Sequence, residues 1–163
     1  MNEHGALNFP GTRAPHFSLP RTTYESVGLS DLAGHPAVLV FYPGDWEPVS
    51  RQQLALYQEC LPELQLFDAA LIGISVDSIW SHAAFARALD LTFPLQADFH
   101  PKGAISRAYR VYQEEKGYGR RALFVLDAEG IVSWSHNYPT NLDPGIDGIL
   151  TALERMQAQE CQA

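Results

Sequence analysis

Two almost uninterrupted apolar segments place the strongest constraint on what this chain can fold into. They are residues 37–42, Ala-Val-Leu-Val-Phe-Tyr, and residues 70–76, Ala-Leu-Ile-Gly-Ile-Ser-Val. Such runs are typical of strands that are buried on both faces of a parallel sheet. The segment between them favours helix from about Gln52 onward. Strands that alternate with helices predict an α/β fold whose central sheet is covered on both faces.

The remaining segments extend this alternation along the chain. Ser78 suits the N-cap of a helix over residues 79–89, and Pro94 restricts a short strand at 93–98 to an edge or a bulge. Pro62 interrupts a helical pattern and therefore predicts a bent pair of helices. The other predicted elements are a strand within 22–29, a helical turn at 30–32, a short helix at 101–110, a loop at 114–119, a hairpin of 121–127 with 131–136, and an amphipathic helix from about 143 to 160.

Composition limits the domain organisation and the kinds of partner. A chain of 163 residues with 46% hydrophobic content can build a core without further support, so we expect residues 1–163 to form one domain. Eleven Lys+Arg against nineteen Asp+Glu give a net charge of −8, which argues against nucleic-acid and anionic-membrane surfaces. The chain shows no secretion signal and no apolar run near the roughly 20 residues that span a bilayer. With two cysteines, a reducing cytoplasm is expected.

The stretch that follows the first apolar run has the features of an anion site. Pro43 helps to end the strand and Pro48 suits the first turn of a helix, so Ser50 falls in that turn. Unpaired N–H groups and the positive end of the helix dipole stabilise negative charge at this position. An anion or an anionic nucleophile is therefore expected at residue 50. The alternative is that Ser50 simply caps the helix.

Residues 43–50 resemble the Pro-x-x-x-Thr-x-x-Cys loop of peroxiredoxins. Pro43 falls on the proline, Glu47 on the threonine and Ser50 on the peroxidatic cysteine. Further segments that resemble this family are 14–20, 73–77, 93–95, 107–109 and 121–127. The chain thus resembles the AhpC/TSA superfamily, and within it the AhpE-like one-cysteine type. This resemblance implies a thioredoxin-like fold of the peroxiredoxin variety, with a central mixed sheet and helices on both faces.

The resemblance also implies roles for individual residues. Arg121 matches the arginine that contacts both thiolate and peroxide, and Pro43 would shield the sulfur from water. Val49 and Trp46 would line the substrate pocket, although a dimer contact or a half-buried core position suits Trp46 equally well. Glu47 departs from the family pattern, because its carboxylate raises the pKa of a neighbouring thiol unless Arg121 neutralises it.

The implied activity is reduction of hydrogen peroxide or organic hydroperoxides by a cysteine at position 50. The implied partners are an external thiol reductant, either thioredoxin-like or of low molecular weight, and a second copy of the chain in a homodimer; no cofactor is implied. A serine hydroxyl is scarcely ionised, so the sequence as written is expected to be inactive. Ser50 is then a substitution that mimics the reduced state. The alternative is a natural serine in a non-catalytic thioredoxin-fold protein that binds a partner or a small anion.

The cysteines and histidines give weaker signals. Cys60 lies ten residues after Ser50, roughly 15 Å along a helix, whereas a disulfide needs Cα atoms within about 7 Å. We interpret Cys60 as a small buried residue and leave Cys161 as a possible resolving cysteine. No Gly-x-Ser-x-Gly elbow surrounds Ser50, which argues against a hydrolase. Metal-ligand spacing is missing and no metal is expected; surface or cap positions are predicted for His4, His16, His35, His82, His100 and His136.

Overall fold

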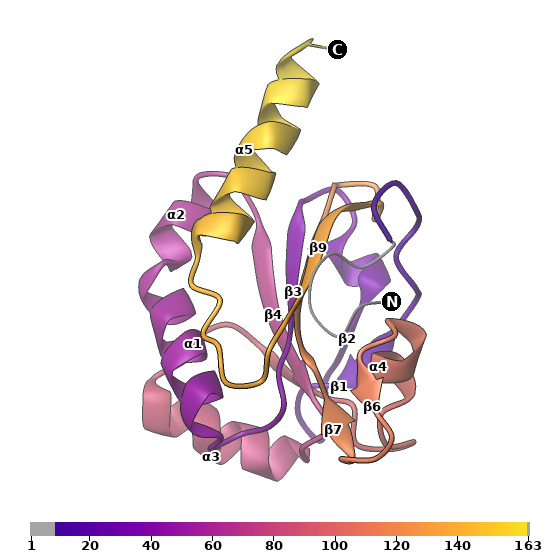
Figure 1. Ribbon diagram of the computed structural model, residues 1–163, viewed down its shortest axis with the longest axis vertical. Helices are drawn as coiled ribbons and strands as arrows, with labels where there is room; N and C mark the ends of the chain where they lie inside the picture. The colour runs from indigo at the N-terminus through magenta and orange to yellow at the C-terminus, as the bar shows by residue number, and fades with distance from the viewer. Residues whose placement is uncertain (1–8, 163) are drawn as a thin grey trace.

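A mixed sheet of five strands lies at the centre of residues 9–162, the part of the chain that the computed structural model describes (Figure 1). Strand β3 pairs in parallel with β4 and antiparallel with β8, while β5 and β9 form the two edges. The two apolar runs therefore form adjacent buried strands, as predicted. Across the sheet the strands are β5 (Leu95–Ala97), β4 (Ala70–Ser75), β3 (Ala37–Phe41), β8 (Arg121–Leu126) and β9 (Val132–Tyr138).

Helices cover one face of this sheet, on the left in Figure 1. They are α1 (Pro48–Glu59), α2 (Leu61–Gln65), α3 (Ile79–Leu89) and α5 (Asp147–Gln162). Val40 and Val125 from the sheet belong to one buried cluster with Leu54 of α1, Phe85 of α3 and Leu153 of α5. The break between α1 and α2 falls at Cys60, two residues before Pro62, and confirms the predicted bent pair.

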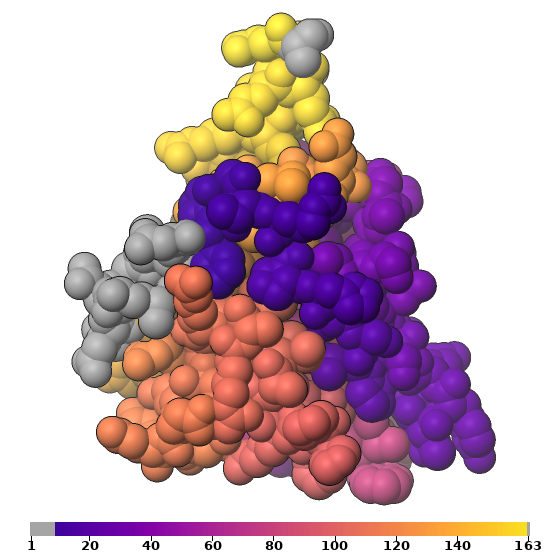
Figure 2. All heavy atoms as spheres, turned by 90° about the vertical axis from the view of Figure 1, so that its right-hand side faces the viewer, coloured from indigo at the N-terminus to yellow at the C-terminus, as the bar shows by residue number. Residues whose placement is uncertain are grey.

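A second layer covers the opposite face with short elements. They are β1 (Ser18–Pro20), β2 (Ser26–Gly28), the 3₁₀ helix η1 (Leu29–Leu32), α4 (Ala104–Ala108), β6 (Tyr112–Gln113) and β7 (Tyr118–Gly119). Aromatic rings fill this side of the core, where the Tyr109 and Phe124 ring centroids lie 5.0 Å apart. In Figure 2, which looks onto this side, the N-terminal part of the chain and the residues from α4 to β7 form a continuous cover.

Three predicted boundaries differ from the structure. Gly103 has a left-handed backbone with φ of 74°, so α4 begins only at Ala104. Gly145, with φ of 67°, likewise delays the start of α5 to Asp147. The predicted loop at 114–119 is wrong in its second half, because Tyr118–Gly119 pairs with Tyr112–Gln113.

The last helix extends beyond the body of the molecule. Met156 is the last buried residue of α5, and residues 157–162 are exposed. Figure 1 shows this end of α5 projecting away from the sheet, at the opposite end of the molecule from the beginning of α1. Within residues 9–162, no helix combines the length and the apolar character needed to cross a membrane.

Candidate functional site

The loop between β3 and α1 brings residue 50 to the edge of the sheet where the parallel strands end. Tyr42 and Pro43 are buried, and Trp46 adopts an unusual backbone with φ of 69°. A bulky residue in this conformation is strained by about 1–3 kcal/mol, and the surrounding contacts must hold it there. Trp46 is about half exposed, and its ring packs edge-on against Phe85 of α3 with centroids 5.1 Å apart.

Glu47 caps α1. Its carboxylate accepts hydrogen bonds from the backbone N–H groups of Val49 at 3.0 Å and Ser50 at 2.7 Å. Ser50 lies in the first helical turn, as predicted, and is fully buried. Its hydroxyl donates to the Glu47 carboxylate at 2.5 Å. The alternative that Ser50 is the cap is therefore wrong, since Glu47 accepts from the helix and Ser50 donates to Glu47.

Arg121, at the start of β8, places a buried positive charge against this helix turn. Its Nη1 donates to Ser50 Oγ at 3.1 Å and to Gln53 Oε1 at 2.7 Å. Its Nη2 donates to Glu47 Oε2 and to the Thr140 carbonyl, each at 2.7 Å, and Nε also reaches Thr140. Arg121 is fully buried, so the ion pair with Glu47 compensates a charge that would otherwise be costly.

The Glu47 carboxyl is held in its charged form. Partial burial raises its pKa, but the donors around the carboxylate outweigh burial. They are the Ser50 hydroxyl, Arg121 and the N–H groups of Ser50 and Val49, and the net pKa lies below the ordinary value of 4.5. Glu47 is therefore an anion whose charge is balanced within the protein.

Three further residues complete the site, and sequence reasoning missed them. Gln53 is fully buried, and its Nε2 donates to the Tyr57 hydroxyl, which in turn donates to the Gly145 carbonyl. Residues 50, 53 and 57 share one helix face, and this spacing was a usable signal. The Thr140 contribution comes from a backbone carbonyl, for which the residue type gives no signal.

A groove of about 470 Å³ opens beside Glu47. Val49 lies in its wall, and the Trp46 ring packs against Phe85 of α3. Two basic side chains, Lys116 and Arg120, also line the groove. The other lining residues are Glu47, Pro48, Gln113, Tyr138, Pro139, Thr140 and Asn141.

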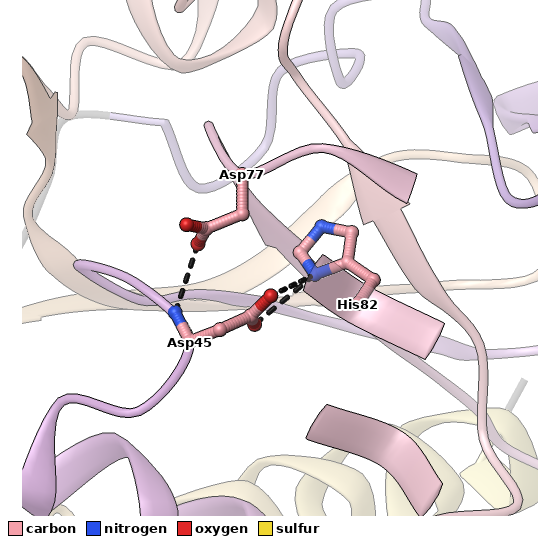
Figure 3. Close-up of side chains that lie close together, drawn as sticks. All are labelled: Asp45, Asp77 and His82. Atoms are coloured by element: carbon pink, nitrogen blue, oxygen red, sulfur yellow. Dashed lines mark hydrogen bonds and ion pairs between the residues drawn. The ribbon is translucent and has the colours of Figure 1, made fainter. Parts of the chain in front are cut away.

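A buried contact between a histidine and a carboxylate holds the loop before α1, as Figure 3 shows. His82 of α3 is 2% exposed and contacts the Asp45 carboxylate through Nδ1 at 2.8 Å, while Nε2 lies 3.1 Å from the Gln96 carbonyl. The prediction of a surface or cap position is therefore wrong for His82. Its position on α3, three residues after Ile79 and three before Phe85, puts it on the buried face of that helix.

Asp45, Asp77 and His82 also have ligand atoms close enough together to hold a metal ion. Both Asp45 oxygens and one Asp77 oxygen already accept from protein donors, however. Asp45 accepts from the Tyr42 and Ser81 hydroxyls, and Asp77 accepts from the Asp45 N–H and the Ser75 hydroxyl. The cluster is therefore satisfied as a hydrogen-bond network, and we assign it the role of anchoring the loop.

The other predicted residues lie outside the site. His16, His35 and His100 are exposed, His136 is partly buried, and His4 lies outside the described residues. Cys60 is partly exposed at the junction of α1 and α2, so the prediction that it is buried is wrong. Burial and then the nearby carboxylates of Glu63 and Glu59 raise the pKa of its thiol. Cys161 is exposed on the projecting end of α5, and both cysteines are free thiols.

Comparisons with known proteins find similarity to one family. Residues 10–135 match the AhpC/TSA family. Peroxiredoxin 2 of Thermoplasma acidophilum is 30% identical over 153 residues, which cover 90% of this chain and 75% of that protein. Alkyl hydroperoxide reductase E of Mycobacterium tuberculosis is 36% identical over 126 residues, which cover 77% of this chain and 82% of that protein.

Solved structures show the same fold. Reduced 2-Cys peroxiredoxin of Plasmodium vivax superposes with a TM-score of 0.86 at 24% identity, covering 94% of this chain and 84% of that chain. AhpC of Enterococcus faecalis superposes with a TM-score of 0.85 at 24% identity, covering 93% of this chain and 94% of that chain. These likenesses, with the mixed sheet between two layers, confirm the predicted fold class.

Proposed function

Because this chain belongs to the AhpC/TSA family and is a peroxiredoxin by descent, we propose that its site is built for thiol-dependent reduction of hydroperoxides at residue 50. One observation carries the proposal: the fully buried Arg121 lies 3.1 Å from the side-chain oxygen of residue 50, in the first turn of α1. Arg121 and that turn together stabilise an anion at this position. With Ser50 as written, the site does not turn over peroxide, because a serine hydroxyl stays protonated.

A cysteine at position 50 defines the reaction. Its thiolate attacks one oxygen of the hydroperoxide, the O–O bond breaks, and the leaving alkoxide takes a proton to become an alcohol, or water in the case of hydrogen peroxide. The sulfur becomes a sulfenic acid. Two external thiols then reduce the sulfenic acid to the thiol and are themselves joined in a disulfide, with release of water. In this scheme Arg121 polarises the peroxide, and buried Pro43 keeps water from the sulfur.

The wider setting of this reaction is part of the proposal. We infer that the chain acts as one domain in the cytoplasm and pairs with a second copy. Its reductant is a thioredoxin-like protein or a low-molecular-weight thiol, and the one-cysteine mechanism is favoured because neither Cys60 nor Cys161 lies in the site. The half-exposed Trp46 suits a contact between copies.

Substitution of residue 50 tests the proposal. The parent protein, Ser50→Cys and the double variant Glu47→Gln, Ser50→Cys are supplied with hydrogen peroxide and dithiothreitol, and loss of peroxide is followed. We expect the parent to be inert and at least one cysteine variant to consume peroxide at least tenfold faster. The same three proteins are also assayed with Cys60→Ser and Cys161→Ser added, which removes any peroxide consumption by the two native thiols.

The alternative function predicts a different outcome. If both cysteine variants consume peroxide no faster than the parent, the peroxidase proposal is lost. The chain would then be a non-catalytic thioredoxin-fold protein that binds a partner or a small anion.

A further inference from the structure

The Glu47 carboxylate takes up the donors that make residue 50 an anion site. We call the N–H groups of Val49 and Ser50 together with the Arg121 guanidinium the anion site. One Glu47 oxygen, Oε2, accepts from the Ser50 N–H at 2.7 Å, the Ser50 hydroxyl at 2.5 Å and Arg121 at 2.7 Å. The other, Oε1, accepts from the Val49 N–H at 3.0 Å. The two oxygens of one carboxylate therefore engage both N–H groups and Nη2 of Arg121, while Nη1 of Arg121 still donates to Ser50 Oγ at 3.1 Å.

The anion site can stabilise only a limited amount of negative charge. A thiolate at position 50 and the oxygen of a bound peroxide would both need Arg121 and the N–H groups of this turn. A carboxylate already in contact with the same donors satisfies them and adds a like charge, which disfavours ionisation of a neighbouring thiol. A serine hydroxyl, in contrast, donates a proton to the carboxylate without acquiring charge. The Glu47 carboxylate is therefore compatible with a neutral serine at position 50 and unfavourable for a thiolate there.

We propose that Glu47 is a built-in anion that occupies the anion site and excludes a peroxide from it. The exclusion of a peroxide rests on the proposed function. That the Glu47 carboxylate occupies the anion site rests on its own contacts alone. Glu47 is then the residue that decides what the site can bind. Its side chain is 27% exposed and lies in the wall of the groove with Lys116 and Arg120. An external anion that replaced the Glu47 carboxylate would reach the anion site through this groove.

Thiol ionisation tests the exclusion, in a background that carries Cys60→Ser and Cys161→Ser. The pKa of the residue-50 thiol is measured from thiolate absorbance in Ser50→Cys and in Glu47→Gln, Ser50→Cys. Gln keeps the size and the accepting oxygen of Glu47 but removes its charge. We expect the thiol of the double variant to titrate at least one pH unit lower and its reaction with hydrogen peroxide to be about tenfold faster, since one unit corresponds to a tenfold change in ionisation.

The two readouts separate this inference from the proposed function. Equal thiol pKa values and equal peroxide rates in the two cysteine variants would overturn the role of Glu47. A lowered thiol pKa without peroxide consumption in either variant would support the role of Glu47 and remove the peroxidase proposal.

A second test needs no cysteine. Glu47→Ala empties the anion site and leaves buried Arg121 without its carboxylate, and sodium formate supplies a small carboxylate in its place. We expect 50 mM formate to raise the melting temperature of Glu47→Ala more than that of the parent, whereas sodium chloride at the same ionic strength shifts both equally. Equal shifts of the two proteins in formate would contradict an anion site that Glu47 fills.

Discussion

Glu47 determines the charge balance around the beginning of α1. It caps the helix, pairs with a fully buried arginine and accepts the Ser50 hydroxyl. These contacts all favour its ionised form, so its pKa lies below 4.5 in the folded protein. An ordinary exposed glutamate would show none of this, and the stability of the protein should therefore depend on the charge of this one side chain.

Acid sensitivity follows from the direction of the Glu47 pKa shift. A carboxyl whose pKa is lower in the folded state stabilises the fold at pH values above its unfolded pKa, and this contribution is lost as the pH falls through the folded pKa. Glu47→Gln is expected to be less stable than the parent at pH 7 by about 2 kcal/mol, the scale of a hydrogen bond to a charged group. The difference should shrink as the pH falls below 4.5. Urea unfolding at pH 7, 5 and 3 measures it, and a difference independent of pH would argue against this reasoning.

At the scale of elements, the His82–Asp45 pair ties α3 to the loop that leads into α1. Both side chains are almost wholly buried, and the two ring nitrogens of His82 face acceptors from two different segments. Through this pair, α3 holds the segment in which Trp46 adopts its strained backbone just before Glu47. The geometry of the anion site is therefore supported by a helix that contributes no residue to it.

Removal of the imidazole should be costly for this reason. His82→Ala leaves the buried Asp45 carboxylate without one of its hydrogen-bond partners, and we expect a loss of about 1–3 kcal/mol in the free energy of unfolding. His16→Ala, at an exposed histidine, is the matched control and should change stability by less than about 0.5 kcal/mol. Guanidinium unfolding of both variants measures the contrast, and similar small effects would show that the pair does not anchor the loop.

The elements themselves were largely predictable from the sequence. Strands β3 and β4 followed from continuous apolar runs, and α3 has the predicted bounds with Ser78 as its cap. The start of α5 was missed because Gly145 adopts a left-handed backbone that residue type permits but does not require. The role of His82 was missed because a helical pattern predicts only which face of α3 is buried. It does not predict that the loop after β3 places the Asp45 carboxylate against that face.

The site was predictable where residue type carries the chemistry. Ser50 in a helix turn and Arg121 beside the central strand followed from local pattern and resemblance, and the structure places them within hydrogen-bond distance. The sequence places Glu47 on the loop, but it does not predict the direction in which the carboxylate points. Whether it points to solvent or into the helix turn depends on contacts with Ser50 and Arg121, which are 71 residues apart in the chain.

At the scale of the whole molecule, the two ends of the sheet differ. The end where the parallel strands finish carries the loop, the groove, the Arg121–Glu47 ion pair and the His82–Asp45 contact. The other end carries α5, which leaves the body after Met156. The buried part of α5 adds Ile149, Ala152 and Leu153 to the core. The outer part contributes no buried residue.

Truncation should separate these two parts of α5. A chain that ends at Gln157 loses only residues that are exposed or lie outside the described part, so its free energy of unfolding should change by less than about 0.5 kcal/mol. Leu153→Ala removes buried methyl groups and should cost about 2–5 kcal/mol. Chemical unfolding of the two proteins makes the comparison. A truncation as costly as Leu153→Ala would mean that the outer turns stabilise the fold.

The projecting helix also determines what Cys161 can be joined to. Cys161 lies fourteen residues beyond Asp147, roughly 20 Å along the axis of α5, on the side of the molecule away from the beginning of α1. A bond from its sulfur to residue 50 of the same chain would require the helix to unwind, whereas its exposed thiol is open to a thiol on another molecule. An intermolecular disulfide at Cys161 would therefore change the mass of the particle in solution and leave the anion site as it was.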